Sequence, residues 1–194
     1  ALSNIYRDGV GTPKDEQDLA ALHPTVTSSQ GAIDGAALLD DHLETGVAMP
    51  YASSEVSPWV QYEFAKPVQV RSFSFALKLR GSFGSNNIGR GLLQASDDGT
   101  NFRTITTLPG AQHDIRALPV RTFTFEPVTA KFWRVIFLPG SGITTVGEFG
   151  APGFFGPTPK NFDLTEVRLF SGARVHRWED KANFAPMFEY TTLG

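Results

Sequence analysis

Apolar and polar residues alternate with a period of two over much of the chain, which is the pattern of half-buried β-strands. Within residues 59–64 every second residue, namely Val60, Tyr62 and Phe64, is apolar and would lie on one face of a strand. Pro67 then interrupts the alternation. Segment 68–80 starts with its apolar residues on one parity and continues with them on the other. Such a change within one strand predicts a β-bulge, here near Arg71–Ser72.

The same alternation predicts several further strands. Residues 90–97 and 102–108 flank Asp98–Gly99, and an Asp-Gly pair between strand-like runs is a strong hairpin signal. Strands are also expected at three later segments, 121–127, 131–139 and 162–172. Segment 131–139 is apolar on both parities, as in a central strand buried on both faces. Seven or eight strands with almost no helix predict an all-β antiparallel β-sandwich or jelly roll, with Trp59 and Trp133 in its core.

The chain divides into three parts by composition. Residues 1–23 are polar and predict a linker or a short helix, with a helical candidate at 14–23 that follows Pro13. Residues 24–175 carry the strand patterns and predict the sandwich. Residues 176–194 contain aromatic side chains that would be unusual on a free tail, so we expect this segment to pack on the sandwich or to lead to a neighbouring module. On this basis the chain is expected to be a fragment of a larger protein.

Composition and charge narrow the classes of function. The net charge is −3 and no stripe of Lys and Arg is present, which argues against nucleic-acid binding. No apolar run approaches the roughly 20 residues needed to span a bilayer. The absence of cysteine does not decide the compartment.

The sequence also lacks the motifs of common enzymes. It has no G-x-S-x-G or H-E-x-x-H motif and no cysteine nucleophile, and its four histidines are widely spaced. Glycoside hydrolysis needs two facing carboxylates, one of them in an apolar pocket, and the only candidates for such an acid are Glu126 and Glu148, each next to a Phe. We therefore expect no catalytic residues in this chain, and expect the histidines to be surface or capping residues.

The order of short motifs resembles one known family. Thr27–Ser28–Ser29 leads to an acidic loop, and WVQYEF, a Gly-Asn loop, SDDGTNF, an aromatic-Arg-Val strand and LTEVRLF follow. Over residues 24–172 this is similar to the galactose-binding-like sandwich, also called the discoidin or F5/8 type C domain, which family 32 carbohydrate-binding modules share. The later segment RVHRWEDKANF resembles part of bacterial α-L-rhamnosidases of glycoside hydrolase family 106. The resemblance implies a secreted, periplasmic or cell-surface bacterial protein.

The resemblance also implies a structural calcium ion in the acidic loop 37–46. In the family's pattern the ligands would be Asp40, Thr45 and Glu166, whereas Asp41 and His42 depart from it. Calcium prefers six to eight oxygen ligands, and a loop rich in carboxylates and carbonyls offers them, although histidine is a poor ligand for this ion. The alternatives are an ordinary solvated loop and, less in keeping with the sequence, a catalytic site.

A sugar site is implied at the loop end of the sandwich. An Arg at a strand end and an Asn in the next loop often contact the sugar in family 32-like modules, a neighbouring polar group completes the set, and an aromatic ring serves as the platform. The matching positions are Arg80, Asn86 or Asn87, then His42 or Tyr51, and finally Phe154 or Phe155. Each has an ordinary alternative role in a strand end, a turn or the interior.

Three functions remain open at this point. The first is a non-catalytic module that binds an oligo- or polysaccharide of plant or algal origin within a larger bacterial glycoside hydrolase. The second is a purely structural sandwich that braces a catalytic domain through the aromatic tail. The third is a discoidin-like adhesion domain for proteins or lipid head groups, which would need exposed apolar loop residues.

Overall fold

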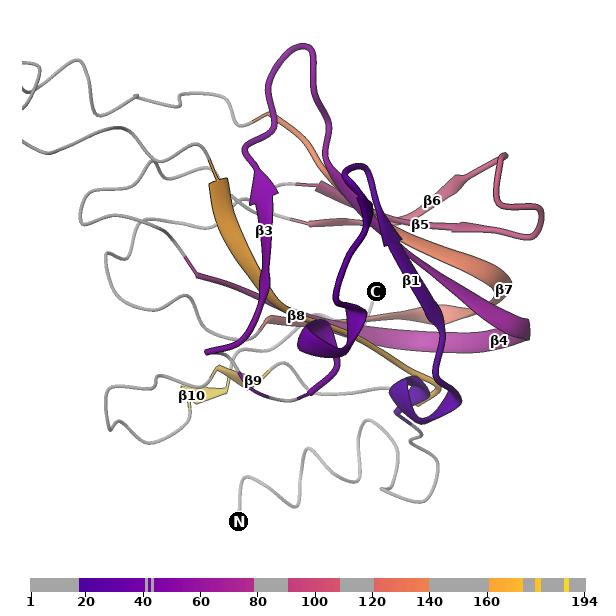
Figure 1. Ribbon diagram of the computed structural model, residues 1–194. Coiled ribbons are helices and arrows are strands. Elements are labelled where there is room, and N and C mark those ends of the chain that lie inside the picture. Colours follow the sequence, from indigo (N-terminus) through magenta and orange to yellow (C-terminus); the bar gives the residue numbers. More distant parts are fainter. Residues whose placement is uncertain are drawn as a thin grey trace, which may run out of the picture.

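A computed structural model describes residues 18–40, 42, 44–78, 91–108, 121–139, 161–172, 177–178 and 187–188. Two 3₁₀ helices and ten strands follow one another in this part of the chain (Figure 1). Their order is η1 (Leu19–Leu22), β1 (Thr25–Ser28), β2 (Gly31–Ala32), η2 (Gly35–Leu38), β3 (Val47–Pro50), β4 (Trp59–Lys78), β5 (Gly91–Ser96), β6 (Arg103–Leu108), β7 (Arg121–Phe137), β8 (Asn161–Phe170), β9 (Arg177–Trp178) and β10 (Met187–Phe188).

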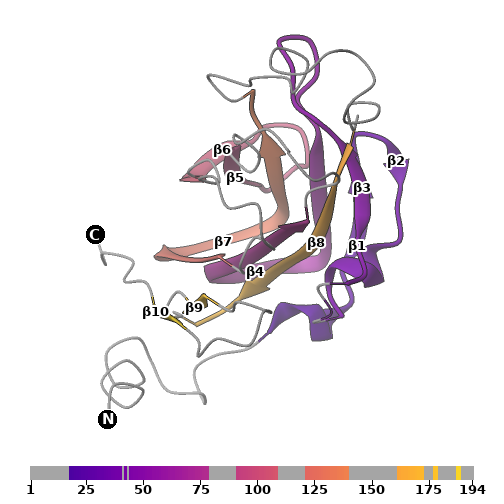
Figure 2. The same ribbon diagram turned by 90° about the vertical axis from the view of Figure 1, so that its left-hand side faces the viewer.

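The first eight strands form an antiparallel sheet folded into two layers. One layer has the order β2-β1-β4-β7-β5-β6. In the other, β8 pairs with the second half of β4 on one side and with β3 on the other. Figure 2 shows β4, β7 and β8 curving together, with β5 and β6 on one side and β1 and β3 on the other. The all-β sandwich predicted from the alternation is therefore confirmed.

The two longest strands, β4 and β7, belong to both layers. β4 passes through register shifts between Glu63 and Val68 and between Val70 and Ser72. The second shift confirms the bulge predicted near Arg71–Ser72, and the first accommodates Pro67, which has no N–H to donate to the ladder. The sequence pattern divided each of these strands in two, and that division is wrong because the chain bends at the irregularities without leaving the sheet.

The core lies between the layers and is rich in aromatic rings. Trp133 is fully buried, as predicted, and its Nε1 donates to the carbonyl of Ala130. Tyr62 crosses the core from the first layer, and its hydroxyl donates to the carbonyl of Val167 on β8 at 2.9 Å. Trp59 is only half-buried and lies outside this core, so its predicted place is wrong. Its side chain alternates with the inward Val60 and points to the other face of β4.

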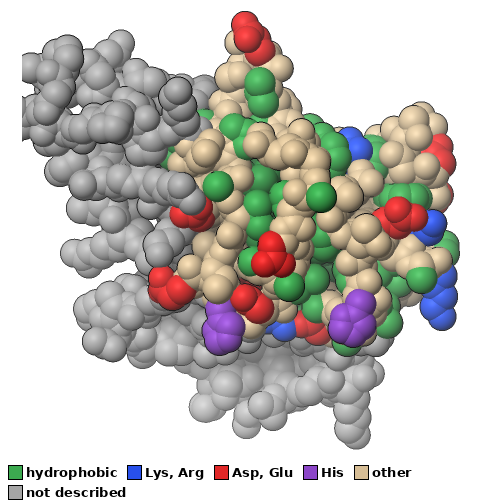
Figure 3. Space-filling view, in the orientation of Figure 1, with side chains coloured by type: hydrophobic (Ala, Val, Ile, Leu, Met, Phe, Trp, Pro, Cys, Tyr) green, Lys and Arg blue, Asp and Glu red, His purple; other side chains and the backbone are tan. Residues whose placement is uncertain are grey.

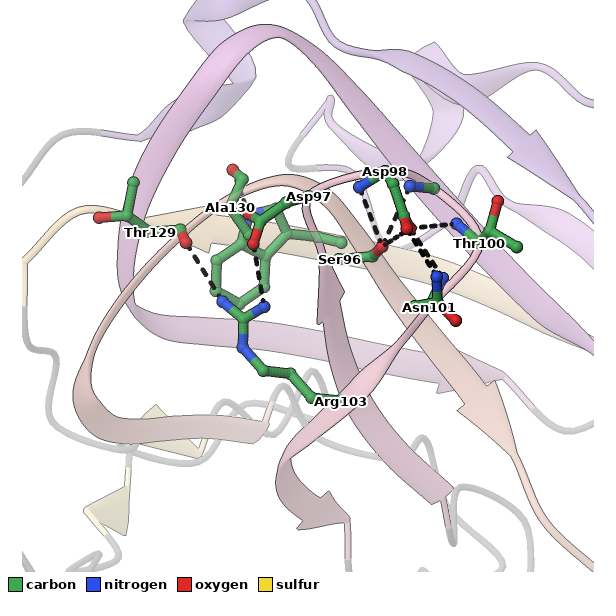
Figure 4. A network of polar contacts seen from close by, with 10 residues as sticks. Ser96, Asp97, Asp98, Thr100, Asn101, Arg103, Thr129 and Ala130 are labelled. Atoms are coloured by element: carbon green, nitrogen blue, oxygen red, sulfur yellow. Dashed lines mark hydrogen bonds and ion pairs between the residues drawn. The ribbon is translucent and has the colours of Figure 1, made fainter.

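The hairpin of β5 and β6 turns where the Asp-Gly pair predicted it. The side chain of Asp98 accepts hydrogen bonds from the backbone N–H groups of Thr100 and Asn101 and from the Asn101 amide, and Gly99 has φ +75° (Figure 4). These bonds hold the pKa of Asp98 far below its ordinary value. Nearby, Arg103 pairs with Asp97. The turn is therefore fixed by its own side chains.

The helical candidate at 14–23 appears only as the short 3₁₀ helix Leu19–Leu22, and residues 14–17 lie outside the described part. Asp18 caps this helix through the N–H of Ala20, and its other carboxylate oxygen bonds Arg168 on β8. The backbone of Asp18 also forms a bridge with Phe170. The start of the described chain is thus held against the end of β8.

Candidate functional site

The acidic loop closes on itself between η2 and β3. Asp40 Oδ2 accepts a hydrogen bond from Thr45 Oγ1 at 2.6 Å, and Asp40 Oδ1 accepts one from the backbone N–H of His42 at 2.8 Å. The Thr45 hydroxyl also contacts the His42 carbonyl at 2.8 Å. The structure therefore brings together the carboxylate and the hydroxyl that the resemblance named as ligands.

These contacts favour the ionised form of Asp40. Desolvation opposes ionisation of Asp40, but the hydrogen bonds from Thr45 and from the His42 backbone outweigh it and lower the pKa of this carboxyl. The imidazole of His42 acts in the same direction. Asp40 is accordingly an anion at neutral pH, which is the form that a cation would bind.

Gly46 fixes the loop against β8. A Cβ at this position would lie 2.7 Å from the carbonyl oxygen of Leu164 and 3.1 Å from Thr165 Cγ2, so only glycine fits this approach. The ladder of β3 with β8 begins at the next residue, where Val47 pairs with Leu164. Continuing that register places Thr45 opposite Glu166, because partners change by one residue in opposite directions along antiparallel strands.

Glu166 is a buried acid on β8. Its side chain is 5% exposed, and its Oε1 lies 3.7 Å from Arg168 Nη1. The negative charge of Glu166 adds to burial in raising the pKa of the Tyr62 hydroxyl. A carboxylate kept charged at this depth needs positive partners, and Arg168 supplies one.

The donors in this region suit a hard cation. Asp40, Thr45 and the carbonyls of their loop all present oxygen atoms, and Glu166 lies on the strand against which the loop is packed. Among the described residues no three side chains of His, Asp, Glu or Cys converge on one point. A calcium ion here would therefore depend on the hydroxyl and on backbone carbonyls for most of its ligands.

The predicted sugar-binding residues divide into separate groups. Tyr51 follows β3 directly and is half-buried, with its ring centroid 5.7 Å from that of Phe162. It lies at the end of the sheet where β8 begins and where β4 ends at Lys78, which pairs with Asp163. The remaining candidates Arg80, Asn86, Asn87, Phe154 and Phe155 lie outside the described residues.

His42 belongs to the opposite end of β3. It is exposed, as predicted, and lies in the loop before that strand, whereas Tyr51 comes after it. The first and last residues of a four-residue strand lie about 10 Å apart. His42 therefore belongs with the acidic loop and not with Tyr51, and His23, also exposed, caps η1 with φ 48°.

One arrangement was not predicted from the sequence. Arg134 on β7 stacks on two aromatic rings, with its guanidinium carbon 3.7 Å from the Phe102 centroid and 4.7 Å from that of Trp59. Its Nη2 and Nε both donate to Gln61 Oε1. The sequence did indicate that Trp59 and Gln61 share a face, because both have the parity opposite to that of the core residues of β4.

Figure 3 shows the charge on one face of the molecule. Acidic side chains are scattered singly there, and apolar side chains gather along its centre. Lys and Arg form no patch on the visible surface of the described residues. No helix in the described part of the chain is long and apolar enough to cross a membrane.

A two-layered antiparallel sandwich with bent strands common to both layers is the architecture of discoidin-like β-sandwich domains. The F5/8 type C domain model matches residues 24–149. The chain belongs to the F5/8 type C domain family. No curated protein matches the sequence.

Several solved structures share this fold. A rhamnosidase from Novosphingobium sp. PP1Y is similar over 79% of this chain, with a TM-score of 0.53 and 20% identity, and the chain covers 12% of that protein. The module CpGH89CBM32-5 from Clostridium perfringens, solved with GalNAc-beta-1,3-galactose, gives a TM-score of 0.51 at 16% identity, covering 79% of this chain and 99% of the module. Chitosan-binding module 1 from Paenibacillus sp. IK-5 gives 0.51 at 21% identity, covering 79% and 98%.

Proposed function

We propose that this chain is a non-catalytic carbohydrate-binding module of a larger bacterial glycoside hydrolase of the α-L-rhamnosidase type. The observation that carries the proposal is its family membership together with a fold that spans nearly the whole of a module solved with a disaccharide. The similarity to a small part of a rhamnosidase supports the proposal that the parent enzyme is of this type. The parent protein would then act on plant or algal polysaccharide outside the cytoplasm, in the periplasm or at the cell surface.

We place the sugar site at the end of the sheet that carries Tyr51. The ring of Tyr51 packs on Phe162, so its position at this half-buried surface is fixed. Arg80 and Asn86 or Asn87 come after β4 in the sequence and would supply polar groups, and Phe154 or Phe155 would supply a platform; these five residues lie outside the described part of the chain. His42 is no longer assigned to this site, because it lies before β3.

Titration calorimetry of the chain against L-rhamnose, D-galactose and a rhamnose-rich pectic polysaccharide tests the proposal. Binding in the millimolar to micromolar range that is lost in Arg80→Ala and weakened in Tyr51→Ala would support it. Tyr51→Phe is the matched control for the ring contact with Phe162, and it separates loss of the hydroxyl from loss of packing. No heat across the panel would contradict a sugar site.

A structural brace is the second candidate. The observation that favours it is the clamp between Asp18 and Arg168, which fastens a segment outside the family match to the end of β8. A sandwich built to hold its neighbours would show such anchoring without any ligand. The brace would be favoured over carbohydrate binding if calorimetry detected no binding heat. It would be favoured over discoidin-like adhesion as well if the chain also co-purified with its parent catalytic domain.

We also propose that the acidic loop holds a structural calcium ion. Asp40 and Thr45 already present a carboxylate and a hydroxyl side by side, and Gly46 packs against Leu164 and Thr165 of β8, next to Glu166 in the sequence. When bound, the ion would supply positive charge that ties the loop to the strand. It would take no part in sugar chemistry.

A further inference from the structure

The outer face of the first layer carries a row of polar side chains across five strands. Directly opposed residues in antiparallel strands point to the same face. Thr27 pairs with Gln61, Gln61 and Gln94 both pair with Arg134, and Gln94 pairs with Thr104. Neighbouring strands lie about 4.8 Å apart, so this row is about 19 Å long.

Arg134 is the single charge in the centre of this row. The other four members are neutral hydrogen-bonding side chains, and none of the described acidic residues pairs with Arg134. The nearest acid in the adjacent row, Glu63, is engaged by Lys131 Nζ at 2.8 Å. Partial burial lowers the pKa of the Arg134 guanidinium, and no carboxylate in the described part of the chain offsets this.

The guanidinium is held in one orientation. Phe102 and Trp59 contact it from elements on either side of β7, at 3.7 and 4.7 Å from the ring centroids. Gln61 Oε1 accepts from both Nε and Nη2, at 3.3 and 2.8 Å. That side of the guanidinium is thus occupied, and the N–H groups of Nη1 and the second N–H of Nη2 form the edge that remains for a ligand.

We propose that this row is a second binding surface, distinct from the Tyr51 end, and that it takes an acidic glycan whose uronate carboxylate binds the Nη1–Nη2 edge of Arg134. A planar guanidinium binds a carboxylate through two parallel hydrogen bonds, and the glutamine and threonine side chains beside it can bind the hydroxyls of adjoining sugar rings. The faces of Trp59 and Phe102 that do not contact Arg134 provide apolar surface for pyranose rings. The inference adds a ligand class to the proposed function and uses none of the residues assigned to the first site.

The test is calorimetry of the chain with an α-1,4-linked galacturonic acid trimer and with the same trimer fully methyl-esterified. The ester keeps the ring and its hydroxyl groups but has no charge, so it isolates the carboxylate. The free acid should bind and the ester should bind at least tenfold more weakly, with an affinity for the acid that falls as salt is raised.

Two arginines provide the matched variants. Arg134→Gln should weaken binding of the acid about tenfold to a hundredfold, because a charge-assisted hydrogen-bond pair is lost. Arg134→Lys keeps the charge without the planar fork and should give an intermediate loss. Arg103→Gln is the control, because Arg103 is already paired with Asp97 and bonds the carbonyl of Thr129 (Figure 4). Thermal melts of each variant establish that it is folded.

The outcomes separate this proposal from the proposed function. Binding of the acid that is lost in Arg134→Gln, unchanged in Arg103→Gln and unchanged in Tyr51→Ala would support the second surface. Equal binding of acid and ester, or acid binding that survives Arg134→Gln and falls in Tyr51→Ala, would overturn it and leave the carbohydrate-binding module intact. No binding of any neutral or acidic sugar would overturn both.

Discussion

Replacing Gly46 with alanine should weaken both the fold and the proposed calcium site. The added Cβ would lie 2.7 Å from the Leu164 carbonyl oxygen, whereas ordinary contact begins at 3.4 Å, so the loop would have to retreat by about 0.7 Å. The obstacle is backbone on the central part of β8 and cannot rotate away. Overpacking of this kind costs about 1–3 kcal/mol, which corresponds to a fall of about 2–12 °C in Tm for a domain of this size.

The assay is thermal unfolding by circular dichroism, in EDTA and again with added calcium. In the unsubstituted chain calcium should raise Tm, since an ion that binds only the native state stabilises it by mass action. In Gly46→Ala this increment should shrink, because Thr45 moves away from the strand that carries Glu166. The loss of stability should thus be larger in calcium than in EDTA.

Gly31→Ala is the matched control. It adds the same methyl group at the β1–β2 turn, where nothing lies within 4 Å but φ is +96°. It should lower Tm through backbone strain of about 1–2 kcal/mol and leave the calcium increment unchanged. An unchanged Tm in Gly46→Ala would refute the steric reasoning, and an unchanged calcium increment would refute the place of the ion.

Three further predictions, which use five substitutions, have separate expected results. Asp40→Ala and Glu166→Ala should abolish the calcium increment in Tm, whereas Glu44→Ala should preserve it; equal increments in all three would contradict the ligand assignment. Tyr62→Phe leaves the Val167 carbonyl without its buried donor and should cost about 1–3 kcal/mol in urea unfolding, an effect absent if water replaces the hydroxyl. Asp98→Asn should lower Tm above pH 3.8, the ordinary pKa, and the difference should vanish as pH falls through the lower pKa of the folded state, since a depressed pKa stabilises only the ionised form; a constant difference in a pH series would refute this.

The alternation of side chains predicted the fold well, because it depends on local burial. It placed the bulge at Arg71–Ser72 and the β5–β6 turn, where the responsible residues are adjacent in sequence. It also contained the answer for Trp59, because this residue has the opposite parity to Val60 and Tyr62, but the prediction rested on its position within a strand pattern and not on its parity. β3 was not predicted, since four residues are too few to show a period.

The candidate site could be predicted only in its local part. Asp40 and Thr45 are five residues apart and meet as expected. The clamp of Arg168 by Asp18 joins residues 150 apart, and no local pattern carries that information. His42 or Tyr51 was expected to complete the polar set from a neighbouring loop. Only β3, a strand that was not predicted, shows that these two residues lie at its opposite ends.

The passage of β4 and β7 through both layers has a consequence for how the domain comes apart. A sandwich of two separate sheets has a seam, and one sheet can in principle loosen while the other stays intact. Here β4 and β7 run continuously from one layer into the other, and the Tyr62 hydroxyl adds a hydrogen bond between the layers. Amide hydrogens of β5 in one layer and of β8 in the other should therefore exchange through a single cooperative opening, with the same free energy, rather than layer by layer.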